Sequence, residues 1–168
     1  MQRRKLLAVG AATGVLLTIA GGALGLLRPV RVDGRFTAIS AAALAAVAQS
    51  VLEGFLPVDP AARAAQLQAH LNRLQATIAG FAPAMQGEVD ELLAMLAHPA
   101  GRLALLGLRS QWEVATALEV HAAMRALQTS SSNLRQQVFH ALRDLTNAAY
   151  FADSSTWVQV GYPGPRPV

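Results

Sequence analysis

The stretch Leu134-Arg-Gln-Gln-Val-Phe-His-Ala-Leu-Arg-Asp-Leu-Thr-Asn-Ala-Ala149 decides the fold class. Its apolar residues recur every three or four positions, at Leu134, Val138, Leu142, Leu145 and Ala149. This spacing places them on one face of an α-helix, with polar side chains on the other face. The sequence therefore predicts a long amphipathic helix that packs against a core.

The same period continues upstream, and no stretch alternates cleanly enough to propose a sheet. We therefore expect an all-α protein, a helical bundle of about five to six helices over residues 37–151. The expected helices cover about 37–55, 60–80, 84–97, 102–108, 110–127 and 134–151. Asp59 before Pro60 predicts one helix start, and the spacing of Ser110 and Glu113 predicts a capping box at another.

The N-terminus carries the pattern of an export signal. Arg3 and Arg4 precede Leu6 and Leu7, which begin an uncharged run that ends at Leu27. A paired arginine before such a run is typical of twin-arginine signals, although a basic flank of any membrane helix would look similar. Its 22 residues could also span a bilayer core of roughly 30 Å as an uncleaved anchor. Residues 1–36 are thus interpreted as an export signal or anchor of a periplasmic, inner-membrane-associated protein.

Composition excludes several function classes. The formal net charge is +4, but outside Arg3, Arg4 and Lys5 the 11 basic residues face 10 acidic ones. With no basic stripe in the body, we expect no nucleic-acid partner. The chain has no cysteine, which excludes disulfides, thiolate metal sites and covalently attached haem.

No residue pattern indicates an active site. The four histidines are His70, His98, His121 and His140, and no pair has the i, i+4 spacing of a helical metal site. Each is expected at the surface or the edge of the core. The acidic residues Glu88, Asp90 and Glu91 are interpreted as the solvated start of a helix. We therefore expect no catalytic residue and no metal bound by this chain.

The last segment, residues 152–168, changes character. Its glycines and prolines disfavour regular helix, so an irregular tail is expected. Apolar side chains in such a tail must pack against something, either the chain's own bundle or another chain. The candidate partner-binding residues are Trp157, Val160, Gly161, Tyr162, Pro163, Gly164 and Pro165. Tyr150 and Phe151 are instead expected in the chain's own core.

The last third of the chain resembles a known family, the gluconate 2-dehydrogenase subunit 3 family. The matching elements, in order, are the helix Leu134 to Leu145, the run Ala149-Tyr-Phe-Ala-Asp153, and the run Trp157-Val-Gln-Val-Gly-Tyr-Pro-Gly-Pro165. The third of these is the most specific. The resemblance covers about residues 118–165, and the first half matches only through its helix content and its signal.

The resemblance implies a non-catalytic small subunit. Such subunits accompany a large FAD-binding dehydrogenase of the glucose–methanol–choline type, which oxidises a sugar, alcohol or sterol. The small chain would stabilise the large one and carry it, already folded, through the twin-arginine translocase. Electrons would then pass to a cytochrome c subunit or a quinone, and FAD would sit on the partner.

A second hypothesis comes from a different class of protein. A membrane-anchored helical bundle can hold haem or a small ligand between facing histidines. His121 and His140 lie on two helices expected to be neighbours, so they are the candidate pair. A visible spectrum of the purified chain would separate this hypothesis from the first.

Overall fold

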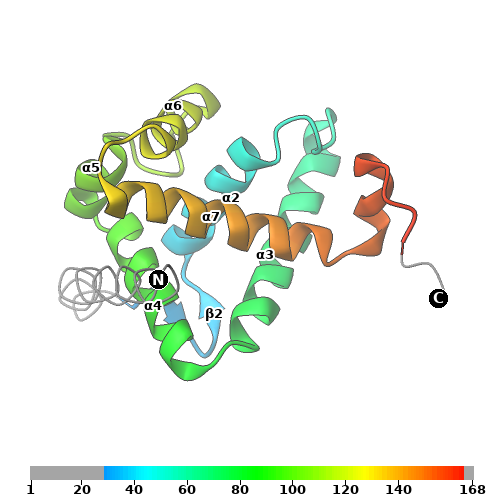
Figure 1. Ribbon diagram of the computed structural model, residues 1–168, viewed down its shortest axis with the longest axis horizontal. Helices are drawn as coiled ribbons and strands as arrows, with labels where there is room; N and C mark the ends of the chain where they lie inside the picture. The colour runs from blue at the N-terminus through cyan, green and yellow to red at the C-terminus, as the bar shows by residue number, and fades with distance from the viewer. Residues whose placement is uncertain (1–28, 165–168) are drawn as a thin grey trace, which may run out of the picture.

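The computed structural model describes residues 29–164, where seven helices follow one short hairpin (Figure 1). The prediction of a mostly helical chain is confirmed. In chain order the elements are β1 Arg31–Val32, β2 Arg35–Phe36, α2 Ala38–Val51, α3 Pro60–Ala79, α4 Pro83–Ala97, α5 Pro99–Leu106, α6 Ala117–Gln128, α7 Asn133–Phe151 and the 3-10 helix η1 Ser154–Val160.

Helix α2 forms the centre of the bundle. It is contacted by α3, α4, α6 and α7, and α7 crosses over it in Figure 1. Its buried residues are mostly small, including Ala43, Ala46 and Ala48, which lets several helices approach its backbone closely. The apolar stripes of the surrounding helices, such as Leu71, Leu74 and Ile78 of α3, close the core around it.

The hairpin corrects the expectation that the chain has no sheet. Strands β1 and β2 pair antiparallel around Asp33 and Gly34, whose φ angles are 50° and 75°. Asp-Gly suits a two-residue turn because both central residues adopt positive φ. Each strand has only two residues, too few to show an alternating pattern. The Asp-Gly pair itself was the signal that pattern analysis missed.

The hairpin also shows that packing begins before Thr37. Val30 is buried in the main core, and its carbonyl accepts a hydrogen bond of 3.0 Å from Thr37 N. The Arg31 guanidinium donates a 2.7 Å hydrogen bond to Asp90 on α4. Asp90 is therefore partnered by a cation, and not simply a solvated residue at the start of a helix. Residues from Val30 onward belong to the folded body.

The helix cap expected at Ser110 is instead Thr116, six residues later. The capping box forms between Thr116 and Glu119, where each side chain bonds the other residue's backbone N–H. Ser110 instead donates to a Glu119 carboxylate oxygen at 2.6 Å. Trp112 explains the difference, because it is buried and its indole N–H donates to Leu96 O at 2.8 Å. This tertiary contact keeps residues 107–116 out of the helix. By contrast, the predicted cap at Asp59 is confirmed, with its carboxylate accepting from Ala62 N at 2.7 Å.

Within residues 29–164, no helix combines the length and apolarity needed to cross a membrane. The expected export signal or anchor falls almost entirely before this range. Arg3, Arg4, Leu6 and Leu7 therefore lie outside the described residues. Their role in export stays a prediction.

Candidate functional site

The C-terminal tail is not irregular throughout, because it starts with a 3-10 helix. The Asp153 carboxylate accepts hydrogen bonds from Ser155 Oγ at 2.7 Å and from Ser155 N at 3.0 Å. These two bonds hold the pKa of Asp153 below its usual range. A side chain that caps the first turn lets η1 form directly after α7. The prolines and glycines that predicted irregular structure act only after Val160.

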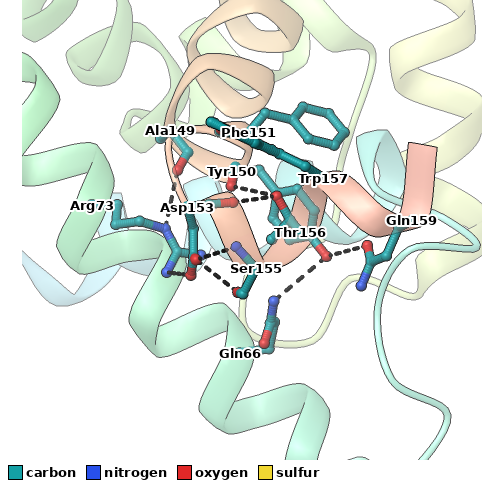
Figure 2. A network of polar contacts seen from close by, with 10 residues as sticks. All are labelled: Gln66, Arg73, Ala149, Tyr150, Phe151, Asp153, Ser155, Thr156, Trp157 and Gln159. Atoms are coloured by element: carbon teal, nitrogen blue, oxygen red, sulfur yellow. Dashed lines mark hydrogen bonds and ion pairs between the residues drawn. The ribbon is translucent and has the colours of Figure 1, made fainter. Parts of the chain in front are cut away.

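Arg73 of α3 fixes the point where α7 passes into the tail. Its Nε donates to Ala149 O at 3.0 Å, and its Nη1 lies 3.2 Å from an Asp153 carboxylate oxygen (Figure 2). One guanidinium thus binds both the last turn of α7 and the cap of η1. Its positive charge also matches the carbonyl end of the helix dipole. The direction of the tail is set by this contact.

Tyr150 forms the second polar attachment. It is fully buried, as the sequence indicated, and its hydroxyl lies 3.2 Å from Phe55 O, 3.0 Å from Gln159 Oε1 and 3.5 Å from Gln66 Nε2. Figure 2 shows the hydroxyl between Gln66 and Gln159, which joins α3 to η1. Helix η1 is therefore held at its start, through Asp153, and near its end, through Gln159.

His70 lies beneath this junction and is fully buried, unlike the surface or core-edge position expected for it. Its ring packs 6.2 Å from the Tyr150 ring, centroid to centroid, and neither ring nitrogen has a hydrogen-bond partner among the described residues. Burial, together with the nearby charge of Arg73, lowers the pKa of His70 to about 4. The imidazole is therefore neutral at pH 7.

Trp157 turns partly toward its own chain. Its indole N–H donates to Phe151 O at 2.6 Å, and its ring lies 5.2 Å from the Tyr162 ring. Gly161 has a φ of 69°, a conformation that glycine adopts without strain, and there the chain folds back so that Tyr162 meets Trp157. The two aromatic residues form one preassembled pair.

The outer side of the tail is apolar and open. Val158 is 78% exposed, Val160 49% and Tyr162 48%. Next to Val158 and Tyr162 the surface is hollowed, with a volume of about 690 Å³, and this tail surface is lined by Ser154, Trp157, Val158, Gly161, Tyr162, Pro163 and Gly164. Five of the seven candidate partner-binding residues line this hollow, namely Trp157, Gly161, Tyr162, Pro163 and Gly164. Val160 is exposed but does not line it, and Pro165 lies outside the described residues.

The two histidines considered for haem are both at the surface. His121 Nδ1 lies 3.4 Å from Glu53 Oε2, while the His140 ring packs on its neighbour Phe139. Among residues 29–164, no three histidine or acidic side chains gather as a metal site would require.

Sequence reasoning missed the residues that hold the tail in place. His70 carried a usable signal, because it falls three residues after Leu67 and four before Leu74, on the buried face of α3. Arg73 carried none, since its partners are 76 and 80 residues away.

Comparison of the chain with protein-family models, with curated proteins and with solved structures gives no match.

Proposed function

We propose that the chain is the non-catalytic small subunit of a periplasmic, membrane-associated dehydrogenase. The large subunit would bind FAD and oxidise a sugar, alcohol or sterol, and a cytochrome c or quinone would take the electrons. The small subunit stabilises the large one and supplies the twin-arginine signal for both. This proposal rests on the resemblance of residues 118–165 to the gluconate 2-dehydrogenase subunit 3 family.

The observation that carries the proposal is the tail surface. Val158, Val160 and Tyr162 are exposed on a segment whose backbone is already ordered by Arg73 and Tyr150. Large apolar side chains on an ordered backbone lose little conformational entropy on binding, which favours affinity. The same residues belong to the most specific part of the family resemblance.

The first test is to isolate the tagged chain from cell envelopes, identify what co-purifies and record the visible spectrum. A stoichiometric large chain with flavin absorption is the expected result. A colourless single chain would overturn the subunit proposal. A haem spectrum without a partner would favour the second hypothesis and direct attention to His121 and His140.

The tail surface predicts a specific loss of partner capture. Trp157→Ala combined with Tyr162→Ala removes the aromatic pair, and co-purification of the large chain should fall by roughly tenfold or more, as at interface hot spots. The bundle should remain helical by circular dichroism, because both residues lie beyond α7. Val58→Ala is a matched control, since Val58 is 89% exposed in the turn before α3. Unchanged capture in the double variant would remove the tail from the interface.

Export provides an independent prediction. Arg3→Lys with Arg4→Lys keeps the positive charge but removes the arginine pair that the translocase recognises. Both this chain and its large partner should then accumulate in the cytoplasm, measured by fractionation and immunoblotting. A partner that still reaches the periplasm would refute the carrier role, even if the two chains form a complex.

A further inference from the structure

An apolar groove between α4 and α7 is not used by the proposed function. Met85, Val89 and Leu92 of α4 face Ala141 and Leu145 of α7 across a hollow of about 390 Å³. Met85 is 50% exposed, so apolar surface at this place is open to solvent. A groove between two helices suits a third, extended or helical apolar segment.

We propose that this groove binds the apolar segment Leu6–Leu27 of the same chain. That run contains no charged residue, and residues 1–28 contain basic residues but no acidic one. The groove has acidic side chains at its edges, Glu88 on α4 and Asp144 on α7. Asp144 already pairs with Arg143, whereas Glu88 forms no salt bridge with another described residue. Apolar surface and charge are therefore both complementary.

The first described residues, which follow this segment in the chain, lie beside α4. Arg28 is followed by the hairpin, which Arg31 ties to Asp90 and Gln86 of α4. These α4 residues belong to the same turns as Met85 and Val89 but lie on another face of the helix. Passing around a helix about 10 Å in diameter takes roughly three or four extended residues. Most of Leu6–Leu27 therefore remains available to lie in the groove.

Because the segment is covalently joined to the bundle, weak apolar contacts are sufficient for it to bind the groove. A segment joined by a short linker has an effective concentration on the order of millimolar at its own binding site. Docking would shield an apolar run from water while the chain is free, and a membrane or a translocase would compete for the same run. This inference concerns the single chain and does not depend on a flavoprotein partner.

The test is site-specific photocrosslinking in the full-length chain. A benzoylphenylalanine placed at Ala148, an exposed residue of the groove, should crosslink within the chain to residues 6–27, identified by mass spectrometry. The same probe at Val58 serves as the matched control. Met85→Lys adds a positive charge to the groove at a half-exposed site, so the bundle should stay folded. It should lower the Ala148 crosslink by about fivefold or more, because docking would bury a cation against an uncharged, apolar run.

Several outcomes would overturn the proposal. Mixing isotopically light and heavy chains distinguishes a crosslink within one chain from one between two copies. Crosslinks between copies, crosslinks to a different protein, or an Ala148 yield no higher than that at Val58 would each contradict docking of residues 6–27. An Ala148 crosslink that Met85→Lys leaves unchanged would show that the groove is not the site of contact.

Discussion

The two ends of helix α7 are held in different ways. Its first turns bury Val138 and Leu142 in one apolar cluster with Leu127 of α6. Its last turn also buries an apolar surface, the Tyr150 ring, against Leu52 and Leu67. It adds polar contacts to other helices that, among the described residues, the first turns lack: Arg73 donates to Ala149 O, and the Tyr150 hydroxyl lies between Phe55, Gln66 and Gln159. Apolar contacts are nondirectional and supply stability, whereas hydrogen bonds fix orientation. The comparison indicates that apolar packing stabilises both ends of α7, and that the hydrogen bonds at its last turn also set the direction of the tail.

The largest expected effect is in the apolar cluster at the first turns of α7. Leu127→Ala leaves a cavity at a fully buried position and should lower the free energy of unfolding by about 3 kcal/mol. Urea denaturation followed by circular dichroism measures this loss. Leu103→Ala, at a half-exposed position, should cost less than about 1 kcal/mol. Similar losses in the two variants would break the assignment of stability to this cluster.

A smaller loss of stability is expected at low pH, at the last turn of α7, where His70 packs against Tyr150. The pKa of His70 is about 4 in the folded chain, below the usual 6.5 of an exposed histidine, so the unfolded chain binds more protons between these values. Stability should therefore fall as pH drops from 7 to 5, by at most about 2 kcal/mol from this residue.

His70→Leu isolates that contribution. The variant should lose much less stability than the natural chain between pH 7 and pH 5, measured by urea denaturation at each pH. The pKa values of Asp153 and Glu119 are lowered by hydrogen bonds, so their contributions to stability are lost only at more acidic pH. They therefore add little to the change between pH 7 and pH 5. If stability falls with pH by the same amount in both chains, the pKa of His70 is not lowered by folding.

The smallest effect sharpens the comparison most. Tyr150→Phe keeps the buried ring but removes the hydroxyl, and should cost about 1 kcal/mol of global stability. Amide hydrogen exchange should rise mainly in residues 154–160, because the hydroxyl is one of the contacts that join η1 to α3. Tyr162→Phe, at a half-exposed position, is the control. Exchange that rises evenly over all of α7 would contradict a role confined to the tail.

Local sequence signals predicted much of the fold. The stripes of α3 and α7, the Asp59 cap and the end of the helix expected over 84–97 all appear where spacing or backbone chemistry placed them. The errors arose where distant residues override local preference. Ser110 satisfies the pattern of a cap, yet the buried Trp112, whose indole N–H donates to Leu96 O, moves the cap to Thr116.

The sequence named the segment of the candidate site but not its geometry. The aromatic and proline-rich composition of the tail made it a candidate contact surface, because such side chains must pack somewhere. The exposure of Val158 and Tyr162, and the inward turn of Trp157, depend on the structure that holds η1. No local sequence pattern predicts where η1 lies relative to α3.

The sequence by itself determined the helical class, most helix boundaries and the apolar face of each helix, because these follow from contacts within a few residues. It also predicted an export signal in a segment before residue 29. The tertiary structure alone decided that His70 is buried and uncharged, that Arg73 reaches Asp153, and that the tail points its valines outward. Those outcomes depend on residues up to 95 positions apart, whose meeting is set by the packing of whole helices.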